Sequence, residues 1–112
     1  MLSRLNRLNL REERTRLEKE GRPRHSPLFI QIAAGSSLGE AAPPRFAILV
    51  SKKLAPLSVN RHRTRRLITE IIRHHLSEFP NGNDYLLIPK KAIFAAAPDQ
   101  ILADLISLQK NN

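Results

Sequence analysis

The highest density of charged side chains that could bind a ligand lies in residues 60–66, where four of seven residues are arginines. On a helix, Arg61 and Arg65 are i, i+4 neighbours, and Arg63 and Arg66 are i, i+3 neighbours. Like charges at this spacing repel weakly, and phosphate groups opposite them offset that cost. The free N–H groups of a helix that starts beside Arg61 would add donors for a phosphate. The pattern predicts an anion-binding surface, with a solvated basic helix face as the alternative interpretation.

The positive charge is concentrated rather than spread along the chain. Residues 45–73, which include Lys52 and Lys53, carry eight basic and one acidic side chain, a net of +7 within a total of +9. Such a segment indicates a polyanionic partner, either nucleic acid or an anionic membrane surface. A membrane-bound helix would need the apolar face that this helix needs for the core. Strand-like sequence before Arg61 also differs from a helix-turn-helix reader of DNA, so we expect RNA.

The sequence shows no recognisable catalytic or metal-binding constellation. It contains no cysteine, which excludes disulfides, thiolate nucleophiles and thiolate zinc sites. His74 and His75 are adjacent rather than i, i+3 or i+4 apart, and His75 is expected to be a partly buried core residue. Asp84, Asp99 and Asp104 come from separate segments, and we expect them to be exposed or to act as caps. The isolated chain is therefore predicted to be non-catalytic.

The length and composition of the chain indicate one globular domain. With 112 residues, of which 41% are hydrophobic, the chain can form one core but not two. We expect a single domain over residues 1–112, with disorder limited to residues 1–7 and 111–112. The sequence has no run of about 18 apolar residues, so no membrane span is predicted. The start lacks the apolar segment of a secretory signal, and early glutamates argue against a transit peptide, which favours a cytoplasmic protein.

Hydrophobic periodicity predicts six elements, joined by loops that are rich in glycine, proline and serine. They are a helix over 8–20 ended by Gly21, strands over 25–34 and 46–50, a helix over 61–79 with Asn60 as N-cap, a strand over 84–88 and a helix over 98–110. On the long helix, one apolar arc is assigned to the core: Leu67, Ile68, Ile71, Ile72, Leu76 and Phe79. This order indicates an α+β or α/β sandwich with the helices on one face of a small sheet.

Two segments of the sequence resemble the signature region of the bacterial ribonuclease P protein family. Residues 46–53 read Phe-Ala-Ile-Leu-Val-Ser-Lys-Lys, like the family's strand, and residues 61–68 read Arg-His-Arg-Thr-Arg-Arg-Leu-Ile, like its basic helix start. Shorter matches in the same order extend over nearly the whole chain: Arg7-Leu8, Gly21, residues 26–29 and residues 84–88. The resemblance implies an α+β fold, a two-layer α-β sandwich with a small mixed sheet, ribosomal-protein-like and with a left-handed βαβ crossover.

The resemblance also implies a function. Members of the family assist a catalytic RNA that uses Mg²⁺ to remove the 5′ leader of precursor tRNA, and the protein alone is expected to bind no cofactor. The implied partners are the ribonuclease P catalytic RNA and the precursor tRNA leader, with no membrane and no DNA. The expected RNA-binding residues combine the family positions with the cationic side of the long helix: Arg7, Lys52, Lys53, Arg61, His62, Arg63, Arg65, Arg66 and Arg73. A ribosomal or ribosome-associated RNA-binding protein is the alternative, and a protein-only nuclease is a third hypothesis.

Several residues depart from the family pattern. His62 replaces the central asparagine of the basic motif, and Thr69 stands where another basic residue is common. In the first helix, Arg14 and Glu18 occupy positions where relatives tend to have phenylalanines, and Ile32 stands where an aromatic residue can occur. Family members bind the leader in a cleft between the first helix and the sheet. Because fewer aromatic side chains are offered for stacking, we expect leader binding here to be more electrostatic.

Overall fold

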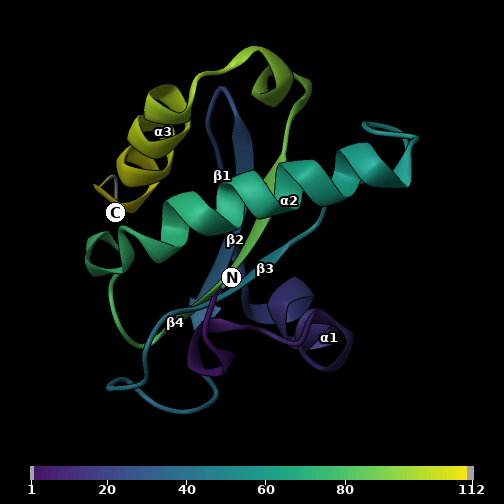
Figure 1. The fold of residues 1–112 in the computed structure, drawn as a ribbon. Coiled ribbons are helices and arrows are strands. Elements are labelled where there is room, and N and C mark those ends of the chain that lie inside the picture. The colour runs from purple at the N-terminus through teal and green to yellow at the C-terminus, as the bar shows by residue number, and fades with distance from the viewer. Residues whose placement is uncertain (1, 111–112) are drawn as a thin grey trace.

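A computed structural model describes residues 2–110 of the chain, so the disorder expected at residues 1 and 111–112 falls outside the described residues. The helices are α1 (Leu10–Glu20), α2 (Ser58–Arg73) and α3 (Pro98–Lys110), and the strands are β1 (Arg22–His25), β2 (Phe29–Gly35), β3 (Arg45–Ile48) and β4 (Asn83–Pro89). Short 3-10 helices are η1 (Arg4–Asn6), η2 (Leu76–Glu78) and η3 (Lys91–Ala95) (Figure 1). Residues 2–7, where disorder is expected, include η1, and two of their side chains, Leu2 and Asn6, are buried.

The strands form one mixed sheet in the order β1-β2-β4-β3. β2 pairs antiparallel with both β1 and β4, whereas β3 pairs parallel with β4 and places Ile48 beside Leu87. Parallel neighbours need a crossover connection, and α2 supplies it. In Figure 1, the parallel strands β3 and β4 both run upward, α2 lies in front of the sheet and β4 lies to the left of β3, so the crossover is left-handed. The expected α+β fold with a small mixed sheet and this crossover is confirmed.

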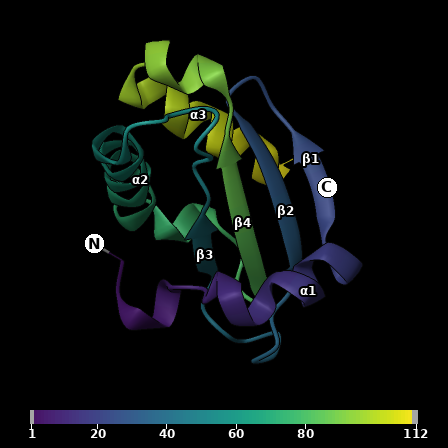
Figure 2. The same ribbon diagram turned by 90° about the vertical axis from the view of Figure 1, so that its right-hand side faces the viewer.

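The sheet is covered on both faces, which corrects the prediction that all helices lie on one face. α2 and α3 cover one face, where Phe29, Phe46 and Leu87 belong to the main core. α1 crosses the other face (Figure 2), and its Leu17 is buried in a second apolar cluster that includes Leu86. Successive side chains of a strand point to opposite faces, so two adjacent buried leucines on β4 require cover on both sides.

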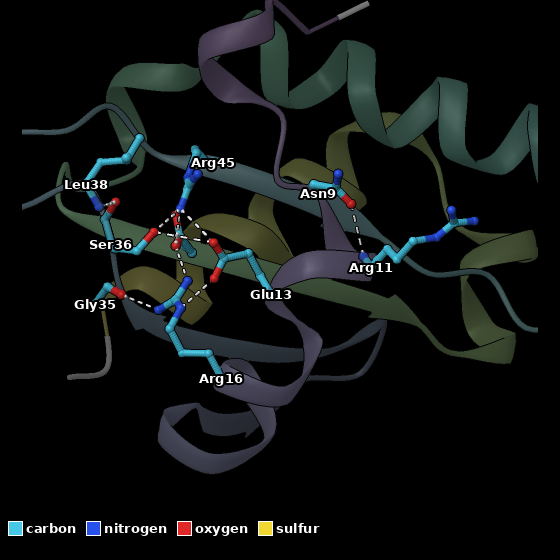
Figure 3. Close-up of polar contacts among 10 residues, drawn as sticks. Asn9, Arg11, Glu13, Arg16, Gly35, Ser36, Leu38 and Arg45 are labelled. Carbon is cyan, nitrogen blue, oxygen red and sulfur yellow. Dashed lines mark hydrogen bonds and ion pairs between the residues drawn. The ribbon is translucent and has the colours of Figure 1, made fainter.

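The ends of α1 are defined by local chemistry. Asn9 is its N-cap, and the Asn9 side-chain oxygen accepts a hydrogen bond of 3.1 Å from the backbone N–H of Arg11 (Figure 3). Gly21 ends the helix as predicted, and its N–H donates to the Leu17 carbonyl at 2.8 Å. A Cβ atom at position 21 would lie 2.4 Å from Cγ2 of Ile32. Glycine at this position therefore lets the end of α1 pack directly against β2.

The strand expected over residues 25–34 corresponds to β2, and a second strand that was not predicted, β1, precedes it and pairs with it antiparallel through a tight turn. The turn is closed by Ser26, whose N–H donates to the Phe29 carbonyl at 2.9 Å and whose hydroxyl accepts from the Phe29 N–H at 3.0 Å. Pro27 lies within this turn, where its missing N–H breaks no ladder hydrogen bond. The hairpin makes β1 an edge strand.

Helix α2 starts three residues earlier and ends six residues earlier than the helix expected over 61–79. Asn60 lies inside the first turn, where its N–H bonds to the Leu57 carbonyl at 3.1 Å, so it is not the N-cap. The N-cap residue is Leu57, and in residues 2–110 no side chain caps this helix start, which is why capping signals misplace it. At the other end, His74 closes the helix and η2 follows.

The buried face of α2 is also rotated relative to the predicted arc. Thr64, Ile68 and Ile72 are buried, whereas Leu67 is 38% exposed, which corrects its assignment to the core. Thr64 fits the interior because its hydroxyl donates to the backbone oxygen four residues earlier at 2.9 Å. A periodicity argument that counts only apolar residues misses such a satisfied polar residue.

Candidate RNA-binding surface

The basic residues of α2 line two different grooves. Arg65 and Arg66 line one groove together with His62, whereas Arg63 lines the other. Successive residues of a helix point about 100° apart, so the residues of a dense basic motif cannot all face one surface. The basic cluster predicted at the helix start is therefore divided between two surfaces.

The first surface, the β3 groove, lies between residues 7–10, strand β3 and α2 and encloses about 580 Å³. Its polar wall carries three arginines and one histidine: Arg7, His62, Arg65 and Arg66. Its apolar lining includes Phe46 and Ile48. The N-terminal segment is fastened to β3 by a hydrogen bond from the Leu8 N–H to the Phe46 carbonyl at 2.9 Å. Tertiary folding thus brings Arg7 to the same groove as α2.

The cations of the β3 groove are available for an external anion. Within residues 2–110, no carboxylate lies within ion-pair distance of Arg7, Arg65 or Arg66. Arg66 Nη2 lies 3.2 Å from His62 Nε2, so His62 orients one arginine of the groove. Glu70 is the acidic residue of the lining, and it lies next to α2's C-terminal end.

Arg61 has a different place from its neighbours. Its Nη1 donates to the backbone carbonyls of Ala55 at 2.9 Å and Pro56 at 2.8 Å. The Arg61 N–H is bonded to the Leu57 carbonyl at 3.2 Å, so it is not one of the free N–H groups at the helix start. The expectation of a phosphate site formed by free N–H groups beside Arg61 is therefore wrong, and Arg61 instead fastens the loop that precedes α2.

The remaining predicted RNA-binding residues lie farther away. Lys52 and Lys53 are exposed in the turn after β3. Arg73 is at the last turn of α2, about 18 Å along the helix from Arg61 at 1.5 Å per residue. Arg73 also pairs with Glu70 at 3.0 Å, so it is not part of the cluster near the helix start.

A buried ionic cluster joins α1, β3 and β4 at one end of the sheet. Asp84 is fully buried, and Arg45 donates two hydrogen bonds of 2.8 Å to it, from Nε to Oδ1 and from Nη2 to Oδ2. Arg16 also donates to Asp84, and its Nε donates to Glu13 at 2.6 Å (Figure 3). The hydrogen bond to Asp84 raises the pKa of Arg45 above its usual value. The prediction that Asp84 is exposed or a cap is wrong, and Arg45 does not contribute free charge.

Sequence reasoning missed this cluster because charge counting treats every arginine alike. The signal that could have found it is Asp84 itself, a single carboxylate at the start of a strongly apolar strand. A buried carboxylate requires cationic and hydrogen-bonding partners. For Asp84 these partners are arginines from other elements, Arg16 of α1 and Arg45 of β3.

Two further titratable residues, Asp104 and His75, also have structural partners. Asp104 accepts hydrogen bonds from the Ser26 hydroxyl and from the Leu28 N–H, the latter at 3.2 Å, so it caps the turn before β2. His75 is half-buried, and its Nδ1 lies 2.9 Å from the Ile71 carbonyl. Within the part of the chain that the structure describes, no group of three or more His, Cys, Asp or Glu is arranged to hold a metal ion.

Among the described residues, the apolar cluster on the sheet face under α1 contains no aromatic ring. Leu10, Ile32, Leu49 and Ile88 are half-buried there. Arg14 and Glu18, at the positions where the family resemblance leads one to look for phenylalanines, form an exposed ion pair of 3.2 Å. A stacked base would find no aromatic partner on this face.

The fold and the unpaired arginines define a class: a small α+β protein whose cationic surface suits a polyanion. The chain belongs to the ribonuclease P protein family, since the family model described as Ribonuclease P matches residues 2–111. Family membership gives the chain an RNA partner, the ribonuclease P RNA, and a role in an endoribonuclease complex of tRNA processing. No helix among residues 2–110 is long and apolar enough to cross a membrane.

Individual relatives agree with this family assignment. The ribonuclease P protein component of Oleidesulfovibrio alaskensis is 31% identical over 105 residues, which are 94% of this chain and 80% of that protein. That of Xanthomonas oryzae is 36% identical over 59 residues, 53% of this chain and 40% of that protein. The solved RNase P protein of Thermotoga maritima superimposes with a TM-score of 0.82 at 23% identity and covers 96% of this chain and 97% of that chain. At that identity, the structural likeness establishes the fold alone.

Proposed function

We propose that this chain is a non-catalytic subunit that binds the ribonuclease P catalytic RNA and the 5′ leader of precursor tRNA. It raises substrate affinity and cleavage rate by neutralising phosphates and positioning the two RNAs, while the RNA carries out the cleavage. The observation that carries this proposal is the β3 groove, where Arg7, Arg65 and Arg66 line one surface from two distant parts of the chain.

The leader is placed on the α1 side of this groove. Leu10 of α1 and Ala47 of β3 both line the groove and also belong to the sheet face under α1, so the two surfaces are continuous. An RNA strand on the sheet face would reach Arg7 and Arg65 without leaving the protein. The half-buried apolar residues of the face would contact sugars and bases, and the arginines would contact phosphates.

Mg²⁺ is assigned to the RNA rather than to the protein. Mg²⁺ prefers oxygen ligands, above all carboxylates and phosphates. Asp84 is held by two arginines, and Asp104 is held by a hydroxyl and a backbone N–H. Both carboxylates are therefore already bound to protein donors, and the Mg²⁺ that serves the cleavage is held by the RNA.

Reconstitution tests the proposal. The full chain is added to a bacterial ribonuclease P RNA at low Mg²⁺, and removal of the leader from precursor tRNA is measured. We expect faster cleavage with the chain than without it, and no cleavage by the chain alone. Unchanged cleavage by the RNA would refute the proposal, and co-purification of the chain with ribosomal subunits would then support the ribosomal alternative.

A charge variant with a matched control locates the surface. Arg65→Ala removes one cation from the β3 groove, and Lys110→Ala removes one exposed cation at the end of α3. We expect Arg65→Ala to weaken binding of the catalytic RNA or precursor tRNA and Lys110→Ala to leave it unchanged. Equal effects of both variants would show that only net charge matters.

A further inference from the structure

A second groove, on the other side of α2, has no role in the function proposed above. This Phe94 groove lies between α2, the loop over residues 54–56 and η3, and it encloses about 520 Å³. Its apolar lining includes Leu54, Leu67 and Phe94, and Arg63 is its cationic side chain. The two grooves of α2 therefore differ in chemistry.

Phe94 differs from the other aromatic residues of the chain. The sequence contains five phenylalanines and tyrosines. Four of them are at most 3% exposed and fill the main core: Phe29, Phe46, Phe79 and Tyr85. Phe94 is 51% exposed, while its neighbour Ile93 is buried and anchors η3. The ring of Phe94 thus presents an open face that core packing does not require.

The charges around Phe94 favour an anionic occupant. Of the described residues that line the groove, Arg63 is charged and none is a carboxylate. Arg63 makes no ion pair within residues 2–110, and exposed Lys91 begins η3 three residues before Phe94. An open aromatic ring beside a free cation is the combination that binds single-stranded nucleic acid, because the ring stacks on a base and the cation contacts the phosphate.

We propose that Phe94 is a base-stacking platform for an unpaired base of the bound RNA, with Arg63 on the adjacent phosphate. This inference rests on the RNA-binding function proposed above and adds a specific subsite to it. The base comes either from the catalytic RNA or from the precursor tRNA. The platform supplies on η3 the stacking that the sheet face under α1 lacks.

Three substitutions separate stacking from apolar bulk. Phe94→Leu keeps an apolar side chain but removes the aromatic face, and Phe94→Tyr keeps the face. Leu38→Ala is the matched control, because Leu38 is 67% exposed in a loop far along the chain from η3. Unchanged melting temperatures establish that each variant is folded, which is expected because both positions are exposed.

The main measurement is affinity of the full chain for ribonuclease P RNA alone, and for that RNA with precursor tRNA that has or lacks a leader. We expect Phe94→Leu to weaken binding about 5- to 150-fold, the range for loss of one stacked base, and Phe94→Tyr and Leu38→Ala to bind like the original chain. A loss seen with the RNA alone assigns the base to the catalytic RNA. A loss seen only with precursor tRNA assigns it to the substrate.

The salt dependence distinguishes the two side chains of the subsite. Phe94→Leu is expected to leave the slope of log affinity against log salt concentration unchanged, since no phosphate contact is lost. Arg63→Ala is expected to reduce the magnitude of that slope by about 0.7, the value for one phosphate of a single strand. A change of slope in Phe94→Leu would contradict stacking.

A fluorescence measurement gives an independent readout. The chain contains no tryptophan, so Phe94→Trp creates a single reporter. We expect its fluorescence to be quenched when ribonuclease P RNA binds. If Phe94→Leu binds RNA normally and Phe94→Trp is not quenched, the groove is not an RNA subsite and a protein segment becomes its candidate occupant. If the original chain neither binds RNA nor stimulates cleavage, the proposed function itself fails.

Discussion

Two groups of arginines in this protein have opposite environments. Arg16 and Arg45 surround the fully buried Asp84 at one end of the sheet. Arg65 and Arg66 line the β3 groove without an ion pair in the described part of the chain. The first group joins α1 to two strands and is neutralised by carboxylates, whereas the second leaves its charge for a ligand. A count of arginines along the sequence therefore overstates the charge that can bind RNA.

The largest expected effect comes from breaking the buried group. Asp84→Ala leaves two guanidinium groups without their shared carboxylate, which should lower the free energy of unfolding by about 3–5 kcal/mol. Chemical denaturation measures this change. The control is Asp99→Ala, which alters an exposed carboxylate in the first turn of α3 and should cost no more than about 1 kcal/mol. Equal stability of the two variants would mean that the cluster is not structural.

A somewhat smaller loss of stability tests which face of α2, the helix that carries Arg65 and Arg66, is buried in the core. Ile72→Ala should lower the free energy of unfolding by about 2–5 kcal/mol, because the Ile72 side chain is fully buried. Leu67→Ala should cost clearly less, because Leu67 is 38% exposed. Thermal or chemical unfolding of both variants gives the comparison. Similar large losses for both variants would restore the arc predicted from the sequence, in which both residues belong to the core.

Measuring both RNA binding and stability for one arginine of each group sharpens the contrast further. Arg66→Ala should reduce the magnitude of the salt slope of RNA binding by about 0.7 to 0.9, if one phosphate contact is lost, with little change in stability. Arg45→Ala should do the opposite, lowering stability while leaving the salt slope unchanged, because Asp84 already neutralises it. Binding titrations at several salt concentrations, together with unfolding curves, measure both quantities. A change of slope in Arg45→Ala would erase the distinction.

The smallest effect at neutral pH concerns the residue that follows Asp84. Burial raises the pKa of Tyr85 to about 12, above its usual value of 10. The folded state therefore holds the neutral phenol, so stability is unaffected below about pH 9 and falls as the pH rises from about 10 toward 12. Because Tyr85 is the only tyrosine of the chain, its ultraviolet absorbance reports the titration directly. A titration midpoint of Tyr85 near pH 10 in the folded protein would show that its hydroxyl is exposed to solvent.

Much of the fold could be predicted from local sequence signals. Gly21 ends α1 as expected, and the apolar run in residues 46–50 overlaps β3, which is an edge strand of the sheet. Strand β1 was missed and the turn at Ser26 was counted as strand, because that turn depends on hydrogen bonds to Phe29 rather than on a distinctive turn sequence. The start of α2 was also misplaced, since no side chain caps it.

The candidate site could be predicted only in part. The sequence placed the cations of α2 and Arg7 among the RNA-binding residues, and the structure brings Arg7, Arg65 and Arg66 into one groove. The sequence could not show that Arg61 donates hydrogen bonds to the loop before α2, because the acceptors are the backbone carbonyls of Ala55 and Pro56, which any residue has. Nor could it single out Phe94, whose exposure depends on how η3 packs.

The sequence by itself determined the basic character of the protein, its α+β class and the residue types that contact RNA in the family it resembles. These properties follow from composition, periodicity and motif, which are local. Only the tertiary structure decided which arginines are free, because a cation is neutralised by whichever carboxylate folding brings within about 4 Å, however distant in sequence. Arg45 and Arg65 belong to the same basic segment, yet Asp84 neutralises the first and the second lines the β3 groove.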